Sequence, residues 1–153
     1  MKKAKLVSIL LIALLYACNN EKAEIPQAQN AQNNAFHIGE YTVYLNTSYT
    51  RDISNKIATK YGIEKSNNRI MLNVSILNNQ SKKSVESDII ANATNLLGQK
   101  KALKEMKFIE NNSVSYAFFS DISNQETLIY NLSISPEQKY SKEIQYTNKF
   151  FTD

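Results

Sequence analysis

The strongest constraint on the fold is a period-two alternation of apolar side chains that recurs from residue 36 to the end of the chain. The clearest segments are 41–45, 70–76, 114–118 and 128–134, and a last one covers 144–150. Successive side chains of a β-strand point to opposite faces, so this alternation predicts strands with one buried face. The chain is therefore expected to be mainly β.

The spacing of these segments points to a particular architecture. Six or seven strands follow one another at short intervals, are rich in β-branched and aromatic residues, and do not alternate with helices. This arrangement favours an antiparallel Ig-like β-sandwich of about seven strands. A small open barrel is the alternative. About 118 residues from Phe36 to Asp153 suffice for one modest domain, but not for two.

One short helix interrupts the strands. Ile53, Ile57 and Tyr61 recur at helical spacing, Asp52 precedes them as the expected N-cap, and Gly62 follows them. Glycine readily adopts the left-handed conformation that ends a helix. The sequence thus predicts a helix between Asp52 and Gly62.

The first 17 residues have the three parts of an export signal. Three lysines precede an apolar run from Leu6 to Leu15, and Ala17 precedes the only cysteine, Cys18. The order Leu-Tyr-Ala-Cys resembles the bacterial lipoprotein box, in which the cysteine thiol receives a diacylglyceryl group before cleavage. We therefore expect residues 1–17 to be a lipoprotein signal peptide and Cys18 to anchor the protein to a membrane. An ordinary secretory signal with a chance cysteine is the alternative.

This leader indicates a protein of the bacterial cell envelope, held in the periplasmic space as a lipoprotein. Asn19 follows the cysteine, whereas an aspartate at this position retains lipoproteins of enteric bacteria at the inner membrane, so the outer membrane is favoured. Residues 18–35 are rich in Asn, Gln and Ala and bury little apolar surface, which predicts a flexible polar tether.

Composition argues against two classes of protein. Of the 18 Lys and Arg residues three lie in the leader, which leaves 15 against 14 Asp and Glu, so the apparent basicity largely disappears and no nucleic-acid partner is expected. The lysines from Lys100 to Lys107 are expected to form a solvated strand face. With Cys18 as the only cysteine, the fold cannot depend on internal disulfides.

The sequence offers no catalytic constellation. His37 is the only histidine, and no G-x-S-x-G nucleophile motif is present. Glu86 and Asp88 are two residues apart on one predicted strand face, where a solvated pair is more plausible than a cation site. We therefore expect no enzyme activity, no metal and no cofactor.

Several blocks, taken together and in order, resemble a known family. They are Tyr61–Ile63, Lys65–Arg69, Leu72–Ile76, Asn95–Gln99, Glu126–Leu128 and Phe150–Asp153. In this combination the chain is similar to the small exported bacterial proteins of the domain of unknown function DUF4426, over roughly residues 36–153. The resemblance implies an exported, single, β-rich domain, and it implies no activity.

Two functions fit the sequence. The first is a non-catalytic module whose sandwich surface or sheet edge binds an envelope protein, for example by strand addition. The alternative is a binder of a small molecule or peptide in a pocket between the sheets. Asn95, Gln99 and Glu126 lie in the family-like blocks and are the candidate groove residues. A pocket of about 300 Å³ or more with a few converging polar groups would favour the alternative.

Overall fold

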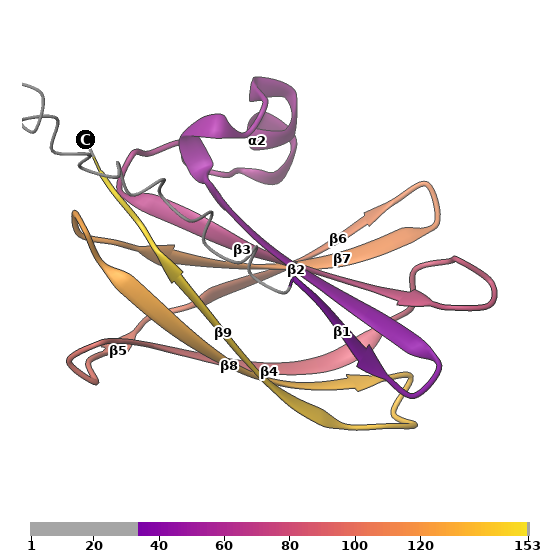
Figure 1. Cartoon of the computed structure of the whole chain (residues 1–153). Coiled ribbons are helices and arrows are strands. Elements are labelled where there is room, and N and C mark those ends of the chain that lie inside the picture. Colours follow the sequence, from indigo (N-terminus) through magenta and orange to yellow (C-terminus); the bar gives the residue numbers. More distant parts are fainter. Residues whose placement is uncertain (1–33, 153) are drawn as a thin grey trace, which may run out of the picture. The chain divides into compact units, whose positions relative to one another are not determined.

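The structure, a computed structural model, describes residues 34–152, which belong to the compact unit formed by residues 33–153 (Figure 1). Two antiparallel sheets face each other, which confirms the predicted β-sandwich. The five-stranded sheet has the spatial order β1 (Ala35–Ile38), β2 (Tyr41–Tyr49), β3 (Arg69–Asn78), β7 (Ser113–Asp121) and β6 (Lys104–Glu110). The four-stranded sheet has the order β5 (Lys100–Lys101), β4 (Ser87–Asn95), β8 (Thr127–Pro136) and β9 (Lys142–Lys149).

The described residues form nine strands, two more than the approximate number that we expected. β1 and β5 account for the difference, because strands of four and two residues are too short to show an alternating pattern. The first strand begins at Ala35, one residue before the predicted start of the domain. Among residues 34–152 no helix is long and apolar enough to span a membrane.

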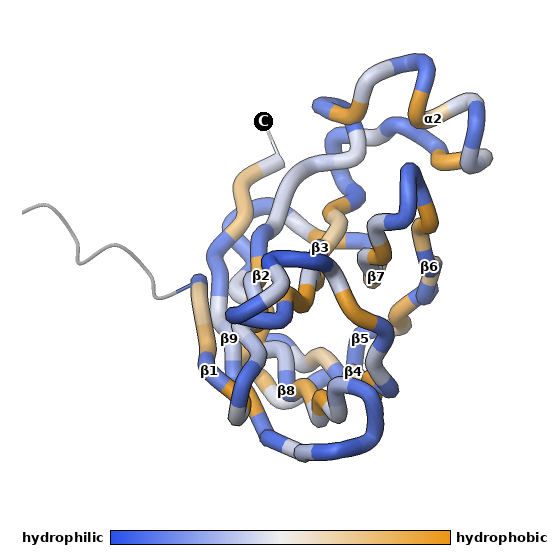
Figure 2. The backbone as a smooth tube through the Cα atoms, turned by 90° about the vertical axis from the view of Figure 1, so that its right-hand side faces the viewer, coloured by the Kyte–Doolittle hydropathy of each residue, from blue (hydrophilic) through white to orange (hydrophobic). Residues whose placement is uncertain are grey.

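The space between the sheets is filled by the side chains that alternate in the sequence. The inward-facing residues of β3 and β8 are fully buried; they are Ile70, Leu72, Val74 and Ile76 on β3 and Leu128, Tyr130, Leu132 and Ile134 on β8. Figure 2 shows the alternation of hydropathy along the strands. The aromatic segment from Tyr116 to Phe119 is buried as well, so it belongs to the core and does not form an exposed platform.

Helix α2 (Asn55–Tyr61) confirms the predicted helix, with one correction at its start. Ser54 is the N-cap and accepts a hydrogen bond from the backbone N–H of Ile57, so the assignment of this role to Asp52 was wrong. Asp52 instead ends a separate 3-10 turn, η2 (Thr50–Asp52), and the extended backbone at Ile53 divides the two elements. Gly62 has φ +63° and ends the helix as predicted.

The outer face of the five-stranded sheet carries a second, smaller core. Ala58 of α2 and Ile63, which follows the helix, pack against Ala117 and Phe119 of β7. β7 is therefore buried on both faces, since its alternate residues Tyr116 and Phe118 belong to the core between the sheets. Ala117 is small and fully buried, which lets the helix segment approach the sheet closely.

Three predictions fall outside the described residues. The signal peptide 1–17 and the lipidated Cys18 lie there entirely, and so does all of the tether 18–35 except its last two residues. They stay predictions of the sequence.

Candidate functional site

The structure brings together the three residues that the sequence proposed as a groove. The side chain of Asn95, at the end of β4, donates from Nδ2 to Gln99 Oε1 at 2.7 Å and to Glu126 Oε1 at 3.3 Å. Its Oδ1 accepts from the backbone N–H groups of Leu97 and Gln99. These bonds close the turn after β4 and hold it against Glu126.

Glu126 is the most enclosed charged group of this cluster, because its side chain is only 10% exposed. Burial acts to raise its pKa, but the backbone N–H of Ser123, the ammonium of Lys101 and the amide of Asn95 outweigh that effect and hold the pKa below its usual range. The Lys101 Nζ atom lies 2.9 Å from Glu126 Oε2. The cluster is thus satisfied by its own members, and its role as a ligand groove stays a prediction.

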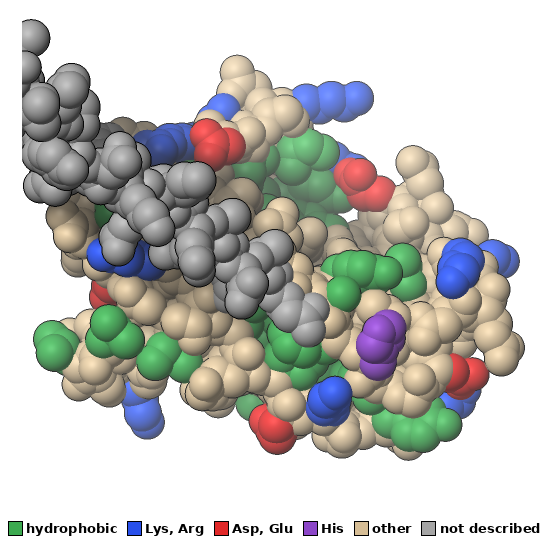
Figure 3. All heavy atoms as spheres, in the orientation of Figure 1, with side chains coloured by type: hydrophobic (Ala, Val, Ile, Leu, Met, Phe, Trp, Pro, Cys, Tyr) green, Lys and Arg blue, Asp and Glu red, His purple; other side chains and the backbone are tan. Residues whose placement is uncertain are grey.

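The remaining candidates from the sequence are on the surface. His37 is exposed, visible in Figure 3 as the one purple side chain, and its Nδ1 lies 3.0 Å from Thr42 Oγ1. Glu86 forms an ion pair with Lys107 at 2.9 Å. No group of three His, Cys, Asp or Glu side chains within residues 34–152 is placed to hold a metal ion.

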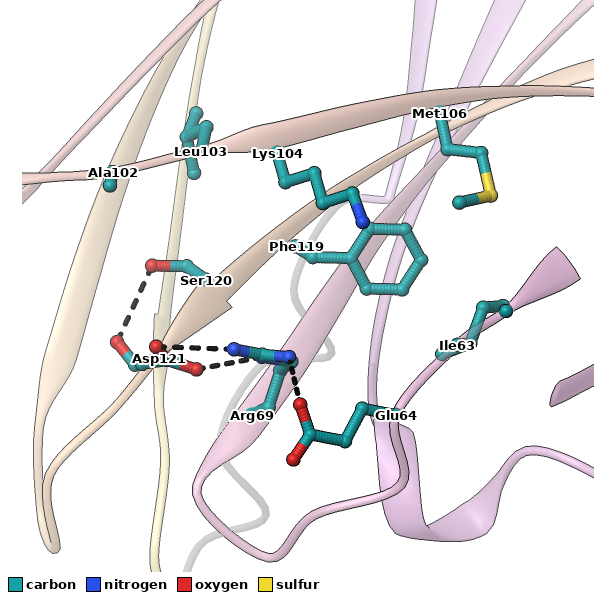
Figure 4. Close-up of a pocket in the computed structure, with 11 residues that line it drawn as sticks. Ile63, Glu64, Arg69, Ala102, Leu103, Lys104, Met106, Phe119, Ser120 and Asp121 are labelled. Carbon is teal, nitrogen blue, oxygen red and sulfur yellow. Dashed lines mark hydrogen bonds and ion pairs between the residues drawn. The ribbon is translucent and has the colours of Figure 1, made fainter.

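A cavity with room for a ligand lies on the outer face of the five-stranded sheet. Helix α2 has seven residues and cannot cover this face, and a cavity of about 390 Å³ remains on one side of it. We call it cavity 1; Figure 4 shows its lining residues, which come from the segment after α2, from β3, from the connection between β5 and β6, and from β6 and β7. They are Gly62, Ile63, Glu64, Arg69, Ala102, Leu103, Lys104, Met106, Phe119, Ser120 and Asp121.

Arg69 forms one wall of cavity 1. β3 and β7 place it directly opposite Asp121, to which its Nε donates at 2.7 Å and its Nη2 at 3.4 Å. Its Nη1 donates to Glu64 Oε2 at 3.0 Å. The hydrogen bond from Arg69 to Asp121 is the main reason why the pKa of Asp121 is lowered; partial burial of Asp121 acts in the opposite direction. Arginine has five N–H donors, and these three bonds leave two of them for a further acceptor.

Lys104 forms part of the opposite wall. It begins β6 and lies directly across from Phe119 of β7, so the two side chains share the outer face of the sheet. Figure 4 shows Lys104 extending toward Phe119, with Met106 beside it. Within the described part of the chain Lys104 forms no ion pair. Cavity 1 therefore combines an apolar floor with one cation that has no carboxylate partner.

A second cavity of about 280 Å³ lies on the same face. We call it cavity 2; Ile63 lines both cavities and separates them. Cavity 2 is more apolar, since Ile57, Met71 and Phe108 line it. At its rim Glu110 accepts hydrogen bonds from Tyr61 and from Lys60, so the polar groups there are already paired.

Reasoning from the sequence did not find this pair of cavities. Lys104 was expected to be part of a solvated face, and a pocket was expected between the sheets, whereas cavities 1 and 2 lie on an outer face. Met106 and Phe108 alternate along β6 and pack together against the small outer core. Nothing in the sequence indicated that a helix would cover only part of that face.

Comparison with known proteins identifies a family and a similar fold. The family model of DUF4426, described as a domain of unknown function, matches residues 35–153. The crystal structure of a DUF4426 family protein from Pseudomonas aeruginosa PAO1 superimposes with a TM-score of 0.69, covering 78% of this chain and 94% of that one at 19% sequence identity. At this identity the similarity shows the fold alone. No curated protein matches the chain.

Proposed function

Because the chain belongs to the DUF4426 family, whose description assigns no activity, we propose a function from the surface of this protein itself. It is a non-catalytic binding module of the bacterial cell envelope that holds a small molecule or a short peptide in cavity 1. Lipidated Cys18 anchors it to a membrane, with the outer membrane favoured, and the polar tether separates the domain from that membrane.

The observation that carries this proposal is cavity 1 itself. Its volume of about 390 Å³ falls within the range of about 300 to 1,000 Å³ typical of ligand sites. Apolar side chains form most of such sites and a few polar groups fix the orientation of the ligand. Cavity 1 has both kinds of group in about equal share, because apolar Phe119, Met106 and Leu103 line it together with Lys104 and Arg69. Its two carboxylates, Glu64 and Asp121, are bound to Arg69.

The anchor is supported by the sequence. A cationic start, an apolar run of ten residues and a small residue before Cys18 occur in the order that lipoprotein export requires. Since two or more acyl chains hold a protein stably on a membrane, the lipid alone would suffice as an anchor.

A protein partner that adds a strand to β4 is the second candidate. β5 pairs with only two residues of β4, and Ile90 of β4 is 68% exposed. The hydrogen bond from Glu137 N to Glu86 O sets the ladder so that the backbone groups of Ile89 and Ala91 point away from β8. Edges of this kind are sites of strand addition.

Site-specific photo-crosslinking in intact cells distinguishes the two candidates. The crosslinking residue p-benzoylphenylalanine replaces Ala102, which is exposed at the rim of cavity 1, Ile90 on β4, or Gln145, which is exposed on β9 and serves as the control. We expect an adduct from position 102 alone, with the mass of a small molecule or short peptide. A protein adduct from position 90 alone would support strand addition instead. Equal labelling from all three positions, or none, would contradict both.

A further inference from the structure

We infer that cavity 1 takes a small amphiphilic anion, in which an apolar body carries a single carboxylate or an equivalent acidic group. This inference rests on the proposed function and specifies the ligand class of the same site. It follows from where the apolar and the cationic groups stand within one cavity.

The acidic end of the ligand is assigned by two cationic side chains, Lys104 and Arg69, that line the same cavity. Lys104 carries a compact ammonium that has no ion-pair partner within residues 34–152, and Arg69 keeps two N–H groups after bonding to Asp121 and Glu64. Hydrogen bonds between charged partners are stronger than those between neutral groups. A carboxylate is the group that satisfies an ammonium and guanidinium N–H donors at the same time.

The two carboxylates at this cavity do not cancel that preference. Asp121 and Glu64 are both bound to Arg69, which offsets their charge. Their side chains are 72% and 76% exposed and Lys104 is exposed as well, so water screens all three, but only Lys104 lacks a charged partner among the described residues. Arg69 is only 32% exposed and is held in place between them. The carboxylates thus position the guanidinium, while Lys104 stays available to the ligand.

The apolar body is assigned by the floor between these donors. Phe119 lies directly opposite Lys104 across the β6–β7 pair, and Ile63 closes the far side. Both expose less than a tenth of their surface, whereas Met106 and Leu103 are only half-buried and still present apolar surface to water. A ring or short aliphatic chain that covers Met106 and Leu103 removes this surface from water, which is favourable. Because the volume is near the lower end for ligand sites, the ligand is small.

Binding of a matched pair of probes tests the inference. 3-Phenylpropionate and 3-phenylpropionamide share one apolar body and differ in charge, and each is titrated calorimetrically into the full-length protein in non-ionic detergent, with a detergent-only titration subtracted. The variants are Lys104→Gln, which removes the ammonium, and Met106→Gln, which makes the floor polar. Lys83→Gln, in an exposed turn away from cavity 1, is the matched control. Circular dichroism of each variant establishes that it is folded.

We expect the acid to bind roughly tenfold more tightly than the amide, a difference of about 1.4 kcal/mol, because the carboxylate forms a charge-assisted hydrogen bond with the ammonium of Lys104 that the amide lacks. Lys104→Gln should abolish this preference and leave the amide unaffected, whereas Met106→Gln should weaken both probes and Lys83→Gln neither. Equal binding of acid and amide that only Met106→Gln weakens would overturn the anionic ligand while supporting the cavity. Binding of neither probe, or binding that Met106→Gln does not weaken, would count against the cavity and so against the proposed function as well.

Discussion

A buried hydroxyl with no partner makes Tyr130→Phe the most informative test of the core. Tyr130 is fully buried on β8, and its Oη is the only buried side-chain polar atom of the described residues that lacks a hydrogen-bond partner. Burial also raises the pKa of this phenol well above its usual range. The change to phenylalanine removes one oxygen and keeps the ring, including its contact with Tyr146 at 6.3 Å between centroids.

The expected change in the free energy of unfolding follows from the energetic cost of burying the Tyr130 hydroxyl without a hydrogen-bond partner. A buried polar group without a partner costs about 1 to 3 kcal/mol. Part of this is offset, because the site vacated by the oxygen loses some packing contacts. We therefore expect the free energy of unfolding to rise by about 1 kcal/mol, which corresponds to an increase in Tm of roughly 4 °C for a domain of this size.

Tyr41→Phe is the matched control, since Tyr41 is equally buried but its hydroxyl has partners. It donates to Glu137 Oε2 at 2.6 Å, lies 3.1 Å from Glu40 Oε1, and accepts from Lys139 at 3.3 Å. The hydrogen bond to Glu137, followed by burial, raises its pKa to about 12. The same substitution should therefore destabilise the protein at this position.

Urea unfolding of both variants at pH 7, followed by circular dichroism, measures the two effects with opposite expected signs. A loss of stability in Tyr130→Phe would show that the hydroxyl has a partner, such as a buried water, and the reasoning would fail. A Tyr41→Phe variant as stable as the parent would show that its bonds to the surface carboxylates contribute nothing.

Two further predictions concern the anchor and the buried carboxylate. Cys18→Ser should release the protein from the membrane fraction while the domain still folds, and Asn20→Ser should leave it there; a serine variant that stays with the membrane would refute the lipid anchor. Glu126 has a lowered pKa in the folded state, so its stabilising effect is present above the ordinary value of 4.5 and is lost as the pH falls through the folded value. Acid unfolding of Glu126→Gln should accordingly show a smaller loss of stability over that interval than the parent does, and identical profiles would contradict the assignment.

Local patterns were sufficient for the individual elements. Alternation predicted the long strands because side-chain direction in a strand depends only on position along the chain. Gly62 was predicted to end the helix because glycine tolerates positive φ, and its φ angle is +63°. The N-cap shows the limit of such reasoning. Asp52 and Ser54 have similar capping ability and both precede the helix, and the local sequence did not reveal that Ser54 is the cap.

The candidate site depended on contacts that no local pattern contains. Arg69 and Asp121 are 52 positions apart and meet only because β3 pairs with β7 in one particular register. The packing of α2 against Ala117 likewise requires the helix to fold back over the sheet. Because α2 is short, it leaves cavity 1 open.

The sequence by itself determined the seven longer strands, where the helix ends and that the fold uses no disulfide, because each of these depends on neighbouring residues or on composition. Only the tertiary structure decided which strands are partners, that β7 is buried on both faces, and that Lys104 and Arg69 face one cavity. Strand pairing is a choice among many long-range contacts of similar local pattern, and packing of the whole chain makes that choice.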